Sequence, residues 1–134
     1  MQFNDVFITV QGAIADSCGI EKDTIKPENT LFNELGINSI DLIDILYTLE
    51  MEHDISLTIS DIEKESRDEL KGKPFEIDNV ITDDALAVLK RMMPEIPSGK
   101  LKPGITVNDL IYLFTVESLC KLVINKIERK AKQM

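Results

Sequence analysis

Four residues of this sequence are the candidates for chemistry: Ser39, the single histidine His53, and the two cysteines Cys18 and Cys120. Ser39 stands at the expected start of a helix. There, free backbone amides and the positive end of the helix macrodipole can hold a phosphate group beside an exposed side chain. Ser39 therefore has two interpretations, a site of modification and a plain helix cap.

The remaining candidates do not assemble into an enzyme site. His53 follows Ser39 without the strand–turn–helix context of a catalytic serine, and the sequence has no glycine-rich phosphate loop and no paired metal-ligand motif. Cys18 and Cys120 are too few and too far apart for a disulfide framework or a tetrahedral metal site. We therefore expect that the chain is not an enzyme, has no catalytic residues and binds no metal.

Two well-defined helices are expected to position Ser39. Apolar residues at helical spacing predict a first helix from about residue 3 to residues 17–19, and a second over residues 39–52 that begins with Asn38 or Ser39 as its cap. A long loop connects them. Four apolar residues of that loop should pack onto the core: Ile25, Leu31, Phe32 and Leu35.

The expected second helix has two apolar sides. One stripe has core spacing and comprises Leu42, Ile45, Leu46 and Leu49. The other lies among acidic residues and combines Ile40, Ile43 and Tyr47 with Asp41, Asp44 and Glu50. The second side is either a docking face for a partner, or it is apolar because the helix is buried on most sides.

The second half of the chain reads as helices separated by loops. Ser60 and Glu63 have capping-box spacing before a helix that Gly72 would close, and residues 74–80 could be extended, although no partner strand is evident. Thr82, Thr106 and Thr115 could each cap a helix, the last running from Val116 to about Lys130 and ending in a basic, solvated tail. An all-helical domain is expected.

Composition limits the partners and the setting of the chain. Its 134 residues carry a formal charge of −9, which repels nucleic acids and anionic membranes and attracts basic protein surfaces. We expect no nucleic-acid partner, no signal peptide and no transmembrane segment. Two scattered cysteines favour a reduced, cytoplasmic location, and a monomer is expected.

The region from residue 30 to residue 57 resembles the phosphopantetheine attachment region of acyl carrier proteins. In that family a Leu-Gly-x-Asp-Ser-Leu-Asp sequence opens the second helix, and Leu35, Gly36, Ser39 and Asp41 match it directly, with Ile40 in place of leucine. The resemblance implies an all-α fold, an acyl-carrier-like four-helix bundle. It also implies that Ser39 carries 4′-phosphopantetheine, which would supply the reactive thiol.

Two residues depart from the family pattern. Asn38 stands where the family usually has aspartate, so one negative charge beside the modification site is absent while the capping ability remains. His53 stands where the family usually has an aromatic core residue. We expect His53 to be packed and hydrogen-bonded, and a pH-sensitive core is the alternative.

The resemblance implies a carrier that shuttles thioester-bound acyl chains between separate enzymes of fatty acid or lipid biosynthesis, including that of lipid A. A peptidyl or aryl carrier and an unmodified helical adaptor are the alternatives. The implied partners are a phosphopantetheinyl transferase and acyl synthases and acyltransferases with basic docking surfaces. The expected docking residues are Asp41, Ile43, Asp44, Tyr47 and Glu50.

The chain is longer than the usual carrier of this family. The extra residues fall after the second helix, so residues 1–134 are expected to be a single carrier domain with a helical insertion at about 58–104. This segment looks too sparse in apolar residues for a core of its own. Its apolar residues are expected to widen the bundle for cargo or to cap its mouth: Ile62, Leu70, Phe75, Ile77, Leu86, Leu89, Met92 and Met93.

Overall fold

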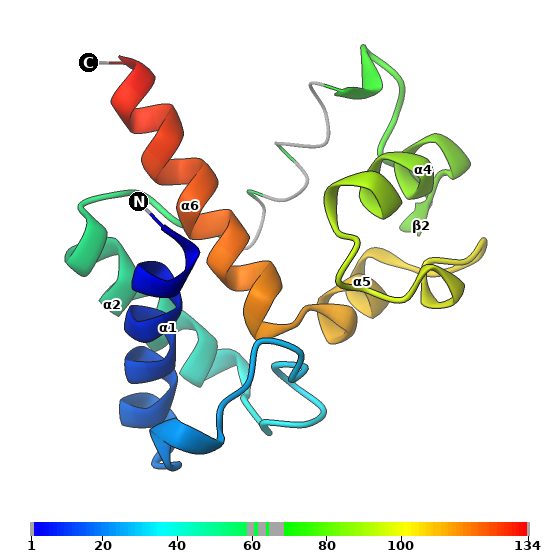
Figure 1. The fold of residues 1–134 in the computed structure, drawn as a ribbon. Coiled ribbons are helices and arrows are strands. Elements are labelled where there is room, and N and C mark those ends of the chain that lie inside the picture. Colours follow the sequence, from blue (N-terminus) through cyan, green and yellow to red (C-terminus); the bar gives the residue numbers. More distant parts are fainter. Residues whose placement is uncertain (1, 59–60, 62–63, 65–68, 134) are drawn as a thin grey trace. The chain divides into compact units, whose positions relative to one another are not determined.

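The computed structural model describes residues 2–58, 61, 64 and 69–133 (Figure 1). The chain divides into two compact units. Unit 1 comprises Met1–Thr58 and Thr115–Met134, and unit 2 comprises Ile59–Phe114. Unit 2 starts close to the expected beginning of the insertion and ends at Phe114 rather than near residue 104. Its interpretation as an insertion within a single carrier domain stays a prediction.

Unit 1 is built from helices. They are α1 (Phe3–Cys18), the short 3₁₀ helix η1 (Lys22–Thr24), α2 (Ser39–His53) and α6 (Val116–Gln133). Helix α1 contacts both α2 and α6, and the three lie side by side in Figure 1. The expected starts and ends of the first two helices are confirmed. The expected tail is different, because α6 continues as a helix to Gln133.

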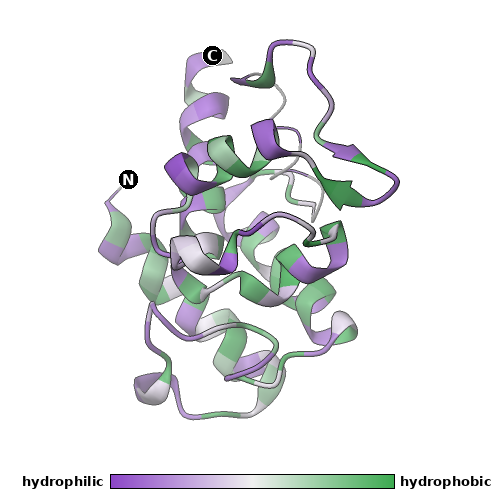
Figure 2. Cartoon of the chain, turned by 90° about the vertical axis from the view of Figure 1, so that its right-hand side faces the viewer, coloured by the Kyte–Doolittle hydropathy of each residue, from purple (hydrophilic) through white to green (hydrophobic). Residues whose placement is uncertain are grey.

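The core of unit 1 lies between these helices. Apolar and polar residues alternate along the helical ribbons in Figure 2, and apolar residues at helical spacing are the buried ones. Of the four expected loop anchors, Ile25 and Leu31 are buried, whereas Phe32 and Leu35 are half-buried. The side chains with no exposed surface in this unit are Val6, Val10, Ile14, Ile25, Ile45, Leu49, Val116, Cys120 and Val123.

Unit 2 contains a small hairpin besides its helices. Strands β1 (Glu76–Ile77) and β2 (Val80–Ile81) pair antiparallel, with Ile77 opposite Val80. Residues 74–80, for which no partner strand was evident from the sequence, thus contain β1 and the start of its partner β2. Sequence periodicity could not show strands of two residues, and the turn uses Asp78 and Asn79 in the left-handed conformation (φ 52° and 69°) instead of glycine.

The helices of unit 2 follow the hairpin. They are α4 (Asp83–Met92), the 3₁₀ helix η2 (Ser98–Lys100) and α5 (Val107–Leu113). Thr82 and Thr106 cap α4 and α5 through their hydroxyl oxygens, as expected. The buried apolar residues of the unit are Leu70, Phe75, Ile81, Ala85, Leu86, Val88, Leu89, Met93, Ile96, Leu101, Ile105 and Leu110. The expected capping box of Ser60 and Glu63 and the candidate core residue Ile62 lie outside the described residues.

The chain re-enters unit 1 at Thr115. This residue forms a β-bridge with Thr30, and the amide of Val116 donates to Asn29 O at 2.9 Å. The Thr115 hydroxyl oxygen accepts the Ser118 amide at 3.2 Å and so caps α6. Thr106 and Thr115, each followed by a valine, therefore both precede helices, but only the helix after Thr115 belongs to unit 1.

Candidate functional site

Asn38 caps α2. Its Oδ1 accepts the amide of Asp41 at 2.8 Å, and Oδ2 of Asp41 accepts the amide of Asn38 at 3.3 Å. These two reciprocal bonds form a capping box, which satisfies two amides at the helix start. Ser39 is thus not the cap, which removes the plain structural interpretation of this serine.

Ser39 is the first residue of α2, and it is exposed. The first hydrogen bond inside the helix runs from the amide of Leu42 to Asn38 O at 3.0 Å. The amides of Ser39 and Ile40 precede it, and they lie at the positive end of the helix macrodipole. A phosphodiester on the Ser39 Oγ would meet these amides, so the residues present fit a phosphopantetheine group attached at this atom.

Two residues restrict the conformation of the loop that leads to Ser39. Gly36 adopts the left-handed conformation with φ 70°, which favours glycine at this position. The next residue, Ile37, is 3% exposed, and its amide donates to Leu31 O at 3.0 Å. Burial of Ile37 immediately before the cap fixes the entry of the chain into α2. Gly36, Ile37 and Asn38, the three residues before Ser39, thus each have a local structural role.

The end of α1 lies beside the start of α2. Ser17 Oγ is 3.5 Å from Asp41 O, within reach of a weak hydrogen bond. Burial raises the pKa of the Cys18 thiol above its ordinary value. The nearby Asp41 carboxylate raises that pKa further, through its negative charge and a hydrogen bond, and Asp44 adds a smaller effect. Sequence reasoning missed this neighbour of the site, because no local motif links Cys18 to Asp41.

The second cysteine is part of the core. Cys120 is fully buried in α6, and burial raises the pKa of its thiol to about 12. Its sulfur therefore stays protonated at neutral pH and packs as a small apolar side chain.

The side of α2 that was expected to be either a docking face or buried is exposed. Ile40 is 78% exposed, Ile43 63% and Tyr47 59%. Met51, which the sequence reasoning did not include, continues the stripe at 67% exposure. We call these four residues the apolar stripe of α2; its exposure excludes the alternative of a helix buried on most sides.

The three acidic residues of the expected docking face differ in their surroundings. Asp44 is exposed, whereas Asp41 is half-buried and takes part in the capping box. Glu50 is half-buried, and its Oε2 accepts the amide of Leu57 at 3.1 Å. The Asp44 carboxylate is therefore the one best presented to a partner.

His53 closes the far end of α2. It is half-buried, and its Nε2 lies 2.9 Å from Thr9 Oγ1, which itself donates to Val6 O at 2.7 Å. Because the hydroxyl proton is used toward Val6, the Thr9 oxygen accepts and His53 Nε2–H donates. The expected packed, hydrogen-bonded histidine is confirmed, and its bond joins α2 to α1.

Comparison with known proteins identifies the family. A model described as the phosphopantetheine attachment site matches residues 9–70, a range that contains Ser39. The acyl carrier protein of Clostridium acetobutylicum is 38% identical over 61 residues, which cover 46% of this chain and 79% of that protein. The chain belongs to the acyl carrier protein family. Its phosphopantetheine cofactor and its role as a carrier rather than an enzyme follow from this membership.

Other acyl carrier proteins show the same range of similarity. The acyl carrier protein AcpXL of Rhizobium meliloti is 34% identical over 59 residues, which cover 44% of this chain and 62% of that protein. The acyl carrier protein of Chlorobium phaeobacteroides is 37% identical over 55 residues, which cover 41% of this chain and 70% of that protein. The similarity to these three proteins thus extends over less than half of this chain.

In the described part of the chain, the histidine, the cysteines and the acidic residues form no group of three that could hold a metal ion. The described helices include none that is long and apolar enough to cross a membrane.

Proposed function

We propose that this acyl carrier protein carries its acyl chain on a phosphopantetheine arm attached to Ser39 Oγ, and delivers it to separate enzymes of fatty acid or lipid biosynthesis, including that of lipid A. The observation that supports this proposal most is that Asn38, and not Ser39, caps α2, while Ser39 is exposed beside it. The arm supplies a thiol that holds acyl groups as thioesters. The chain's own residues present that arm and recognise partners.

The partner surface that we propose lies next to the arm. Ile43 and Tyr47 of the apolar stripe provide area that a partner can bury, and Asp41, Asp44 and Glu50 provide negative charge. Basic surfaces on the phosphopantetheinyl transferase, acyl synthases and acyltransferases would complement this face. We further propose that the carrier works as a monomer in the cytoplasm, in keeping with its charge of −9.

Intact mass spectrometry tests the attachment site. The full chain is incubated with coenzyme A and a phosphopantetheinyl transferase, and the wild type should gain the mass of one phosphopantetheine group. Ser39→Ala should gain none. Ser17→Ala is the matched control, because Ser17 lies beside the same helix start and should leave the gain unchanged. A pantetheinylated Ser39→Ala protein refutes the proposal.

Two further results would separate the alternatives. If several phosphopantetheinyl transferases leave wild-type Ser39 unmodified, the chain is an unmodified helical adaptor. If protein purified from its native cells carries an amino acid or an aromatic acid on the arm, it is a peptidyl or aryl carrier. An acyl chain on the arm supports the proposal, and its mass gives the chain length.

A further inference from the structure

The capping box uses only one of the two polar atoms on the Asn38 side chain. Its Oδ1 accepts the amide of Asp41 at 2.8 Å. Because a backbone amide is a donor, the atom that faces it must be the side-chain oxygen, and the NH₂ group is the other atom. Among the residues that the structure describes, this NH₂ group has no hydrogen-bond partner. Two N–H donors are therefore available at the start of α2.

This NH₂ group belongs to the residue that directly precedes Ser39. Neighbouring Cα atoms are about 3.8 Å apart across a trans peptide bond, and the described residues have no cis peptide bond. Asn38 and Ser39 are both exposed. The Asn38 NH₂ group and a phosphate on Ser39 Oγ would thus stand on adjacent, short side chains at the same end of α2.

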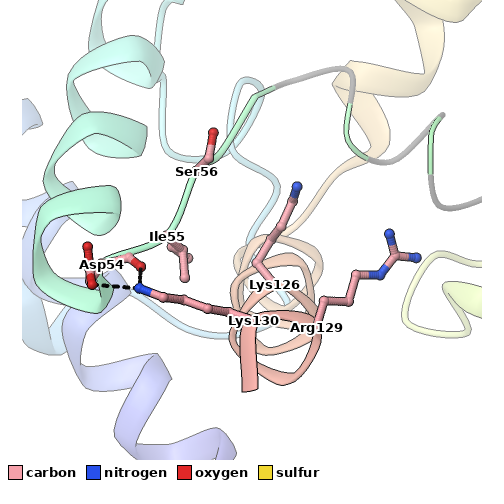
Figure 3. Close-up of a pocket in the computed structure, with 6 residues that line it drawn as sticks. All are labelled: Asp54, Ile55, Ser56, Lys126, Arg129 and Lys130. Carbon is pink, nitrogen blue, oxygen red and sulfur yellow. Dashed lines mark hydrogen bonds and ion pairs between the residues drawn. The ribbon is translucent and has the colours of Figure 1, made fainter. Parts of the chain in front are cut away.

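The two ends of α2 differ in how their polar groups are satisfied. After the helix, Lys130 Nζ of α6 donates to both the backbone oxygen and the Oδ2 of Asp54, as Figure 3 shows. At the start of the helix the terminal groups are donors, and the capping box satisfies two of them. Within the described ranges, the Asn38 NH₂ group and the amides of Ser39 and Ile40 have no partner. An anion can therefore use all three groups.

Charge explains why asparagine suits this position better than aspartate. Both residues cap a helix about equally well. An aspartate here would place a second carboxylate beside that of Asp41, whose Oδ2 lies 3.3 Å from the amide of residue 38. It would also repel a phosphodiester on Ser39, which carries one negative charge. Asparagine keeps the cap, avoids this repulsion and adds a donor for the charged oxygens.

We propose that Asn38 is a positioning residue for the arm: its Nδ2 donates to the phosphodiester that joins phosphopantetheine to Ser39 Oγ. Together with the amides of Ser39 and Ile40, this donor restricts the direction in which the arm leaves the helix. This role depends on the proposed attachment of the arm at Ser39. It is a second task of Asn38 besides the cap, and it exists only in the pantetheinylated protein.

The direct test is NMR of the isotope-labelled full chain before and after pantetheinylation. The side-chain NH₂ signals of Asn38 are assigned through the carbon atoms of the same residue. On pantetheinylation, one of the two Nδ2 protons should shift downfield and exchange more slowly with water, because it becomes bonded to a charged oxygen. The NH₂ signals of Asn33, an exposed residue of the preceding loop, should not change.

Intact mass distinguishes failure of this role from failure of the attachment site. A mass gain that Ser39→Ala abolishes, with unchanged Asn38 NH₂ signals, overturns the role of Asn38 and leaves the arm at Ser39. No mass gain, or a gain that Ser39→Ala retains, contradicts the attachment itself, and the role of Asn38 fails with it. The same shift in Ser39→Ala after incubation with the transferase would also overturn the role, because the arm would not be its cause.

Thermal unfolding gives a second measurement. The melting temperatures of the pantetheinylated and the unmodified protein are compared in the wild type and in Asn38→Asp. Pantetheinylation should raise the melting temperature of the wild type. In Asn38→Asp it should raise it less, or lower it, since a carboxylate then faces the phosphodiester. Effects of the substitution on the unmodified fold cancel in this comparison, and an equal change in both proteins overturns the role of Asn38.

The matched control is Lys130→Gln, which removes the ion pair at the other end of α2 and leaves the start of the helix intact. Pantetheinylation should raise its melting temperature by the same amount as in the wild type. If Lys130→Gln reduces this response as much as Asn38→Asp does, the response follows overall stability, and the role of Asn38 is overturned.

Discussion

Asn38 takes the capping task at the start of α2, and the hydroxyl of Ser39 is left outside the capping box. If the arm is attached to Ser39 as proposed, stability and modification depend on adjacent but different side chains. The asparagine that departs from the family's usual aspartate keeps the hydrogen bond of a cap and omits one negative charge beside Ser39. Substitutions at these two positions should consequently have separable effects.

We expect Asn38→Ala to lower the free energy of unfolding by about 1 kcal/mol, because the Asp41 amide loses its acceptor. Ser39→Ala should change it by no more than about 0.5 kcal/mol. Asn38→Asp is the control, since it keeps an acceptor at the cap. Urea unfolding measures all three. A larger loss for Ser39→Ala than for Asn38→Ala would mean that the serine side chain supports the helix start.

Asp41 acts on Cys18 as well as on the cap. Burial and the Asp41 carboxylate both raise the pKa of the Cys18 thiol, so little of the reactive thiolate is present at neutral pH. Asp41→Asn removes the charge and should lower that pKa. Iodoacetamide should then alkylate Cys18 about two- to tenfold faster, as measured by mass spectrometry.

Asp16→Asn is the control for Cys18, because this nearby exposed carboxylate does not contribute to the raised pKa. Cys120 should stay unmodified in the folded protein, since it is buried and its pKa is raised to about 12. Unchanged alkylation of Cys18 in Asp41→Asn would remove Asp41 as a cause.

The pKa of Asp54 is shifted in the opposite direction to that of Cys18, and this shift makes the stability of the folded protein depend on pH. The hydrogen bond from Lys130 and its positive charge hold the pKa of the Asp54 carboxyl below its ordinary value. Because the folded state disfavours the proton, this contribution to stability is present above the ordinary aspartate pKa and is lost as the pH falls through the lowered one. Asp54→Asn should destabilise the protein slightly at neutral pH and not at strongly acidic pH.

The measurement for Asp54 is thermal unfolding of wild type and Asp54→Asn across that pH range. Asparagine tolerates the left-handed conformation of this position, so the comparison isolates the charge. Asp23→Asn, on exposed η1, should give no such convergence with acid. A constant difference between wild type and Asp54→Asn at every pH would contradict the ion pair as the cause.

At the scale of elements, α2 combines the site, a core stripe and an exposed stripe. Leu42, Ile45, Leu46 and Leu49 are buried as their spacing predicted, while the apolar stripe on the other side remains exposed. Exposed apolar area on one helix of a carrier is area that a partner can bury. The first contact with a basic partner should depend on charge, and the lifetime of the complex on the stripe.

Reversal of one charge tests this face. Asp44→Lys should slow the association of the carrier with its phosphopantetheinyl transferase at low salt, with a smaller effect at high salt because salt screens the charges. Asp44 is chosen because it is exposed and outside the capping box. Asp23→Lys gives the same change of net charge away from α2. Equal slowing by both variants would indicate net charge rather than a docking face.

The sequence predicted the helices better than the hairpin, for a physical reason. Helices α1, α2 and α6 bury residues at regular spacing over many turns, which is a signal within one segment. The hairpin uses two-residue strands and a turn without glycine, so nothing local marked it. At the site, the motif predicted the placement of Ser39, whereas the proximity of Cys18 to Asp41 depends on how α1 meets α2 and has no sequence signal.

At the scale of the whole molecule, unit 2 is the feature that the carrier motif does not explain. It buries twelve apolar residues along Leu70–Leu110, so the segment is less sparse than its sequence suggested. Met93 is buried and Met92 half-buried, and methionine repacks readily around variable neighbours. A role of unit 2 in holding cargo stays a prediction.

Replacement of Ile59–Phe114 by a short glycine-serine linker tests that role. The arm is loaded with acyl chains of increasing length in both proteins. If unit 2 holds cargo, the melting temperature of the full chain should continue to rise with chain length after that of the shortened chain has reached a plateau. Each buried methylene should contribute at most about 0.8 kcal/mol.

The control for this replacement is the pantetheinylated but unacylated form of each protein, which gives the effect of the linker itself. A plateau at the same chain length in both proteins would exclude cargo binding by unit 2. A partner-docking role would then explain the segment better.

The division of unit 1 into two stretches of chain has a consequence during synthesis. Val6, Val10 and Ile14 of α1 emerge from the ribosome first, but α6, which contacts α1 and contributes Val116, Cys120 and Val123 to the core, emerges only after all of unit 2. Part of the apolar surface of nascent α1 and α2 therefore stays uncovered while more than fifty residues of unit 2 are translated. Unit 2 has the opportunity to fold during this time, before unit 1 is complete. On the ribosome, unit 2 is therefore complete before unit 1, whose last helix, α6, is synthesised after it.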